Sequence, residues 1–276
     1  GNSIASGGNY NVAVGDEAGT ALTTGDGNVA VGFEALATED ADGSNTAIGY
    51  RALKVLNAGA EGYNVAVGTD AGLSMTLGIQ NTLVGNKAGD ALTDADFNVA
   101  VGRSSLTSDT LGSKSTAVGH GTLNTQNFTS ATDSFNTAVG YQAGAAVTTG
   151  VQNTLIGSLA GDALTTSTSN TAVGYEALST ATTYSENSAI GYRALKVNTT
   201  GYSNTAVGHE AMLANTTGIS NVAVGHDAML SATTSPSNTV IGHTSGANIT
   251  TGTGENVIVG NRAGFGVTTG AQNIII

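Results

Sequence analysis

The sequence has few of the residues on which most globular domains depend. It contains no cysteine, no tryptophan and one proline, and only 5% of its residues are aromatic and 10% charged. Without cysteine, the chain has no disulfide bonds and no thiolate chemistry. No apolar run reaches the roughly 18 residues that a membrane-spanning helix needs, so we expect no membrane insertion. The net charge of −12 disfavours nucleic acid and anionic membranes as partners.

What the sequence has instead is one motif, repeated throughout. NTAVGHEAM begins at Asn204, and NVAVGHDAM begins 17 residues later at Asn221. The motif starts sixteen times, and twelve of the fifteen spacings are 17, the others being 19, 21 and 18. The starts are Asn11, Asn28, Asn45, Asn64, Asn81, Asn98, Ser115, Asn136, Asn153, Asn170, Asn187, Asn204, Asn221, Asn238, Asn256 and Asn273.

An unbroken repeat predicts a single repeat domain over residues 1–276. The chain begins at Gly1 and stops at Ile276 inside a further copy of the motif. We therefore expect it to be a segment of a longer fibre protein. Each extra residue falls between the ninth position of a copy and the next asparagine, which predicts surface loops there.

Numbered from the asparagine, positions 1 to 5 read N-[V/T]-A-[V/I]-G in most copies. β-Branched residues two apart favour a strand, and the recurring glycine excludes a helix. A short strand every 17 residues predicts an all-β solenoid of about sixteen coils, with neighbouring strands about 4.8 Å apart.

The two faces of this strand differ in composition. We expect the Val and Ile side chains at positions 2 and 4 to point inward, which leaves alanine at position 3 outside. If the assignment is reversed, the exposed stripe is Val and Ile. In either case a long apolar stripe needs a cover, and another copy of the chain is the expected one.

Asparagine at position 1 has two interpretations. Its amide can bond along the stack to the asparagine of the next coil, or it can serve a tight turn or left-handed backbone. Glycine at position 5 predicts a positive φ or a close backbone approach. The candidate structural ladder is Asn170, Asn187, Asn204, Asn221 and Asn238.

A coil that has a large residue at position 9 seldom has one at position 12, and the reverse also holds. Coils with glycine at position 9 have a large apolar residue at position 12, as in Gly161 and Leu164. Coils with Leu or Met at position 9 have a small or polar residue at position 12, as in Leu178 and Ala181, and only Leu56 departs from this rule. Close packing predicts that both positions fill the same core volume.

Position 6 carries the candidate functional residues. Five consecutive coils place a ring there: Tyr175, Tyr192, His209, His226 and His243. This ring ladder either docks a sugar or another chain, or consists only of rings stacking at a coil edge. A metal on the three histidines is disfavoured because no carboxylate completes the set, and no catalytic constellation stands out. We therefore expect no catalytic residue, cofactor or metal.

The phrase N-[TV]-A-[VI]-G-x-x-A, followed by a T-T-G turn as in Thr216-Thr217-Gly218, resembles the head repeats of trimeric autotransporter adhesins. It is also similar to the repeat shafts of bacteriophage tail-fibre proteins. The resemblance extends from Asn11 to Ile276. It implies a homotrimer of parallel β-rolls at a cell surface or on a virion, which binds a host receptor, a surface glycan or matrix.

The expected function is a non-enzymatic structural rod of an extracellular fibre or adhesin that mediates attachment. One alternative is an ice-binding β-solenoid. That function needs rows of outward threonine, and position 2 carries threonine in only part of the coils and is expected to point inward. A second alternative is a polysaccharide-degrading tailspike with its sites between chains.

Overall fold

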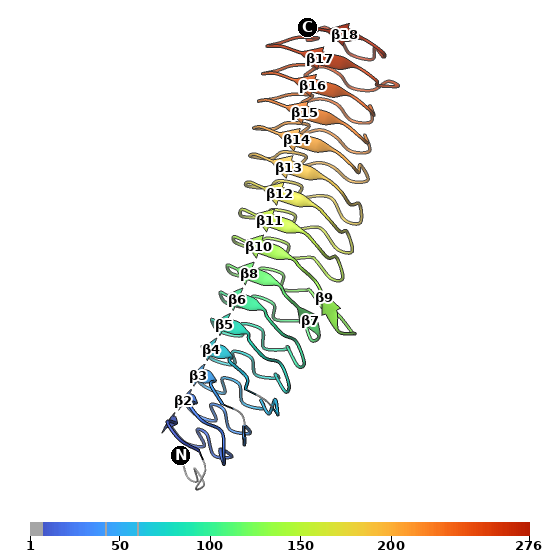
Figure 1. Ribbon diagram of the computed structural model, residues 1–276. Coiled ribbons are helices and arrows are strands. Elements are labelled where there is room, and N and C mark those ends of the chain that lie inside the picture. Colours follow the sequence, from blue (N-terminus) through green and yellow to red (C-terminus); the bar gives the residue numbers. More distant parts are fainter. Residues whose placement is uncertain (1–7, 42, 60) are drawn as a thin grey trace. The chain divides into compact units, whose positions relative to one another are not determined.

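The computed structural model describes residues 8–41, 43–59 and 61–276, which contain strands and no helix. The chain forms two compact units that divide between Asn136 and Thr137. Within each unit, successive coils stack and place their strands side by side (Figure 1). The prediction of an all-β solenoid is confirmed, with about fifteen turns of about 17 residues.

Most coils contribute one strand of three residues. The strands of the N-terminal unit are β1 (Val12–Val14), β2 (Val29–Val31), β3 (Thr46–Ile48), β4 (Val65–Val67), β5 (Thr82–Val84), β6 (Val99–Val101), β7 (Gly112–Ser113), β8 (Thr116–Val118) and β9 (Thr132–Asp133). Those of the C-terminal unit are β10 (Thr137–Val139), β11 (Thr154–Ile156), β12 (Thr171–Val173), β13 (Ser188–Ile190), β14 (Thr205–Val207), β15 (Val222–Val224), β16 (Thr239–Ile241), β17 (Val257–Val259) and β18 (Ile274–Ile275).

Neighbouring strands within a unit are parallel and in register. Each residue of β14 pairs with its counterpart one coil on, so that Thr205 lies beside Val222 and Val207 beside Val224. The same register holds along β1 to β6 and β8, and along β10 to β18. Equal positions of successive coils therefore lie on one another.

The predicted orientation of the strands is wrong. Position 3 is buried in every three-residue strand from β2 to β17, and positions 2 and 4 are half-buried or exposed. Ala206 and Ala223 are fully buried, whereas Ile190 and Ile241 are 41% and 40% exposed. The continuous core therefore does not come from position 4.

The physical reason is the width of the coil. Leu or Met at position 9, such as the fully buried Met212, fills the interior opposite the strand, so only alanine fits at position 3. Among the coils whose position 9 lies in the sequence, position 3 is large only where position 9 is glycine. These pairs are Leu83 with Gly89, Leu155 with Gly161, Val240 with Gly246 and Ile258 with Gly264.

Glycine at position 5 combines both features that the sequence predicts. Gly208 has a φ of +139°, and a Cβ there would lie 2.3 Å from the carbonyl oxygen of Gly225. The backbone of the next coil occupies the space that any side chain would need. The prediction of a positive φ and a close approach is confirmed.

The asparagines of position 1 point inward and bond along the stack. The backbone N–H of Asn204 donates to Oδ1 of Asn187 at 3.2 Å, and its Nδ2 donates to the same oxygen at 3.2 Å. Asn204 Nδ2 also donates to the carbonyl of Gly218 at 2.8 Å. The backbone-to-amide bond recurs at Asn170, Asn187, Asn221 and Asn238.

The longest coil, which begins at Ser115, replaces this ladder with a different buried network. Gln126 Nε2 donates to Asp109 Oδ2 at 2.6 Å and to Ser115 Oγ at 2.9 Å, and Asn136 Nδ2 donates to Gln126 Oε1 at 2.8 Å. The additional residues include β9, which pairs in parallel with β7. The insertion is therefore hydrogen-bonded into the N-terminal unit.

Positions 9 and 12 do reach the same volume. A Cβ on Gly161 would lie 2.8 Å from Leu164 Cδ1, and one on Gly89 would lie 2.7 Å from Leu92 Cδ1. Both positions therefore point into the same space, and the exchange of one for the other stays a prediction. In the exceptional coil with Leu56, the side chain of Leu53 reaches toward the next coil, since a Cβ on Gly72 of that coil would lie 2.7 Å from Leu53 Cδ2.

Asn204→Ala tests the asparagine ladder. The substitution removes the acceptor of the Asn221 N–H, and an orphaned buried donor costs about 1–3 kcal/mol. Chemical denaturation is expected to show a loss of this size. Asn261→Ala, at an exposed position of the same unit, is the control and should change stability by less than about 0.5 kcal/mol. Equal losses in the two variants would contradict the role of the ladder.

A double-mutant cycle tests the shared core volume. Leu178→Gly removes a buried leucine, which costs about 2–5 kcal/mol. The loss is reduced because Leu178 has a φ of +53°, which glycine adopts without strain. Ala181→Leu alone overpacks the coil by about 1–3 kcal/mol. The double variant should show a favourable coupling of at least about 1 kcal/mol. Leu178→Gly combined with Ala232→Leu, three coils away, should be additive.

Candidate functional site

The five position-6 rings form one row in the C-terminal unit, here called the ring row: Tyr175, Tyr192, His209, His226 and His243. Their centroids are 5.6, 4.9, 4.6 and 5.3 Å apart in chain order, and the first three pairs stack with interplanar angles of 17°, 17° and 7°. The last pair is tilted by 31°. The spacing follows the strand repeat, because equal positions of successive coils lie on one another.

Solvent reaches the whole ring row. Tyr175 and Tyr192 are 43% and 39% exposed, and the side chains of His209 and His226 are 45% and 50% exposed. Each ring is thus partly open to solvent, while Tyr192 and His209 have a stacked ring on both sides. The arrangement is available to a ligand along its edges, where imidazole nitrogens and phenol oxygens supply polar contacts.

A row of charged residues at position 7 runs beside the rings. Glu176 Oε2 accepts from Arg193 Nε at 2.9 Å and from Lys196 Nζ at 2.5 Å. Arg193 Nη1 also lies 3.8 Å from Glu210 Oε1, and the Arg193 guanidinium carbon lies 5.1 Å from the centroid of Tyr192. Opposite charges therefore pair between coils. Lys196, at position 10, was not predicted to take part.

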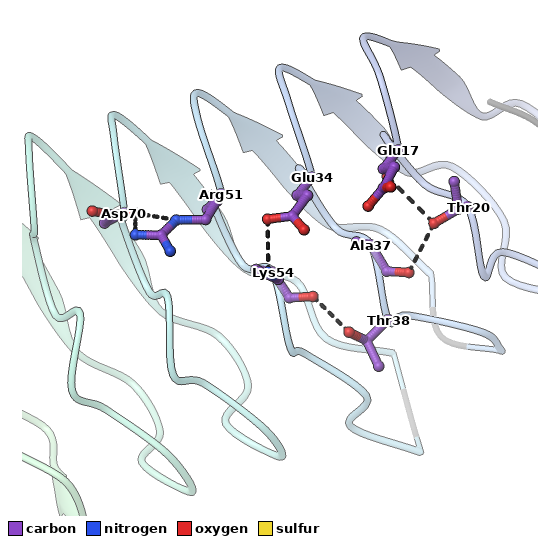
Figure 2. A network of polar contacts seen from close by, with 8 residues as sticks. All are labelled: Glu17, Thr20, Glu34, Ala37, Thr38, Arg51, Lys54 and Asp70. Atoms are coloured by element: carbon purple, nitrogen blue, oxygen red, sulfur yellow. Dashed lines mark hydrogen bonds and ion pairs between the residues drawn. The ribbon is translucent and has the colours of Figure 1, made fainter.

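The N-terminal unit repeats this arrangement in different coils. Figure 2 shows Arg51 paired with Asp70 at 2.9 Å and Lys54 Nζ paired with Glu34 Oε2 at 2.7 Å. Lys54 occupies position 10, twenty residues after Glu34, and the same offset separates Lys196 from Glu176. That offset was the sequence signal that could have identified the lysines.

The structure corrects the conclusion that no carboxylate lies near the histidines, because Asp227 lies close to two of them. Sequence reasoning found no carboxylate to complete a ligand set, yet Asp227 Oδ2 lies 3.1 Å from His226 Nδ1 and Oδ1 lies 3.9 Å from His209 Nδ1. Position 7 adopts a left-handed backbone, with a φ of +55° at Asp227. This conformation turns the carboxylate back toward the rings of its own coil and the preceding one. Nothing in a single copy of the motif indicates that turn.

Four exposed aromatic residues of the N-terminal unit were also missed. They precede the asparagine of their coils directly, at the last position of the repeat: Tyr10, Tyr63, Phe97 and Phe135. Phe135 lies 5.4 Å from Lys114 Nζ, measured to the ring centroid. The described residues enclose no pocket.

The fold and these surface rows define the chain as a parallel β-solenoid with ordered side-chain rows. No protein-family model, no curated protein and no solved structure matches the chain. In the described part of the chain, no helix has the length and apolar character to cross a membrane.

The Glu176 cluster predicts a pH dependence. Hydrogen bonding to Lys196, and secondarily to Arg193, lowers the pKa of Glu176 below its usual value. The unfolded chain, with a glutamate pKa near 4.3, then binds this proton more readily than the folded chain. The stability that Glu176 contributes is present above about pH 4.3 and is lost as the pH falls through its folded pKa.

Glu176→Gln should therefore flatten the dependence of unfolding free energy on pH between about pH 5 and pH 3. Lys196→Met removes the largest cause of the shift and should flatten it too. Denaturant titrations at several pH values measure both slopes. Unchanged slopes in both variants would mean that the cluster is not formed in solution.

Proposed function

We propose that the chain is a non-enzymatic structural segment of an extracellular fibre or adhesin, which associates with further copies of itself and carries an attachment surface. The observation that supports this is the outer strand face, defined as the side chains of positions 2 and 4. All of them are Val, Ile, Thr or Ser. Eleven of their apolar members are at least 36% exposed: Val12, Val14, Ile48, Val65, Ile156, Ile190, Val222, Ile241, Val257, Ile274 and Ile276.

An apolar face that continues along a whole sheet calls for a partner, since contiguous exposed apolar patches are small on monomers. A second copy of the chain fits best. Its outer strand face has the same residue types and the same spacing of about 4.8 Å, so the side chains of two copies can interlock coil by coil. Charged residues are absent from positions 2 and 4, so no charge has to be desolvated when the faces meet.

The resemblance to adhesin heads and phage fibre shafts bears on the number of chains in the proposed assembly and on its location. It favours a trimer at a cell surface or on a virion. In such an assembly the outer strand faces are covered, and the ring row of the C-terminal unit stays available to a surface glycan or a host receptor. Exposed aromatic edges with polar atoms suit such ligands.

One observation favours ice binding as a second candidate. Five consecutive coils of the C-terminal unit present a hydroxyl group at position 2, where side chains point outward: Thr137, Thr154, Thr171, Ser188 and Thr205. The orientation of the strand thereby removes one of the two reasons for which the sequence disfavoured this function, namely the expected inward direction of position 2. The row is interrupted by Val222, and position 4 carries no threonine in any coil.

Light scattering coupled to size exclusion tests the assembly. The unmutated chain should have three times the 27.1 kDa mass of one chain. Ile190→Lys with Ile241→Lys places two charges on the outer strand face and should yield monomers, or shift assembly to much higher concentration. Thr217→Lys, on an exposed turn, is the matched control and should leave the trimer intact. A monomeric unmutated chain would contradict the proposal.

Thermal hysteresis separates the two candidates. A fibre segment should leave the freezing point of its solution unchanged, and ice crystals should grow with their ordinary shape. A freezing-point depression that disappears in Thr171→Lys would establish ice binding in place of the fibre function.

A further inference from the structure

Three potential metal ligands converge within the ring row. One atom each from His209, His226 and Asp227 lies within 4.8 Å of the other two. We propose that these residues bind a divalent transition-metal ion. All three belong to one chain, so the site does not depend on the assembly proposed above.

The ligand types select the class of metal. Two imidazoles and one carboxylate suit Zn²⁺, Co²⁺, Ni²⁺ or Cu²⁺, with water at the remaining position. Ca²⁺ and Mg²⁺ take oxygen ligands almost throughout, which this set does not offer. The ion is therefore one for which imidazole nitrogen is a preferred ligand.

The carboxylate supplies an independent observation. Asp227 Oδ1 is buried and accepts no hydrogen bond from any described residue, although it faces His209 Nδ1 across 3.9 Å. A buried carboxylate oxygen without a donor is costly. An ion between Asp227 and the two rings would satisfy it.

The backbone holds the carboxylate in this place. The N–H of Asp227 donates to the carbonyl of His209 at 3.0 Å, which ties position 7 of one coil to position 6 of the coil before it. Only the two histidine side chains must move. Their lone pairs lie in the ring planes, so both rings have to swing out of their stack to bring their nitrogens about 2.0–2.1 Å from the ion. Both side chains are about half exposed, which leaves room for that rotation.

His243 is excluded from the site and supplies the matched control. Its Nδ1 lies 2.8 Å from Thr244 Oγ1, and its ring is tilted by 31° from that of His226. It occupies position 6 of the next coil, in a comparable surface environment. Loss of His243 should therefore leave metal affinity unchanged.

Calorimetric titration of the full chain with Zn²⁺ at neutral pH tests the site, and the visible spectrum of the Co²⁺ complex reports its coordination. One ion per chain is expected, with a tetrahedral Co²⁺ spectrum. His226→Gln and Asp227→Asn should each weaken binding at least about tenfold, the smallest loss usual even for groups that only support a ligand. His243→Gln should stay within about twofold of the unmutated chain.

Circular dichroism of each variant without metal controls for folding. Asparagine tolerates the left-handed backbone at position 227, and His226 is exposed, so both variants should fold. If Asp227→Asn does not fold, the comparison of Zn²⁺ affinity between His226→Gln and His243→Gln tests the proposal by itself. Absence of Zn²⁺ binding, full affinity in Asp227→Asn, or an equal loss in His226→Gln and His243→Gln would each overturn the proposal.

Discussion

The in-register stacking of equal positions is the constraint on which the rest of the structure depends. Each strand residue of a coil lies beside the residue of the same position in the next coil, about 4.8 Å away. A position can hold only residues that tolerate the residue at the same position of the neighbouring coil. Asparagine meets this condition inside the coil, because its amide is both donor and acceptor and the backbone N–H of the next asparagine bonds to its oxygen. Glycine meets it at position 5, where the backbones approach too closely for a Cβ.

The same constraint explains how the core tolerates changes of sequence. In most coils one large side chain at position 9 or 12 fills the interior, and in four of the coils with glycine at position 9 a second one at position 3 adds to it. Leu155, Gly161 and Leu164 share it in one coil, and the next coil fills it with Leu178. Because the core is closely packed, the total side-chain volume in a coil matters more than the position that supplies it. The repeat can therefore vary within a coil without disturbing the register between coils.

The sequence predicted those features that repetition makes visible, namely the solenoid, the glycine contact, the exchange of core volume and the surface rows. It did not predict which strand face is buried. Hydrophobicity alone places Val207 inside and Ala206 outside, but the depth available behind the strand decides, and Met212 already fills it. Left-handed backbone at positions 7, 9 and 17 was also missed. Residues as different as Glu176, Leu178 and Glu186 adopt it, so no residue type marks it.

These left-handed residues connect the fold to its surface chemistry. Position 7 folds back toward the rings at position 6, so an acid and a ring that are neighbours in sequence also become neighbours across coils, as Asp227 is to His209 and His226. One substitution at position 6 or 7 therefore changes contacts with two coils and leaves the core untouched. Where several successive coils carry rings at position 6, the stacking of the backbone is enough to arrange these rings into a row. A chain built on one rigid repeat can thus acquire an ordered surface row through changes at two positions, while the asparagine ladder and the glycine contact hold most coils in place.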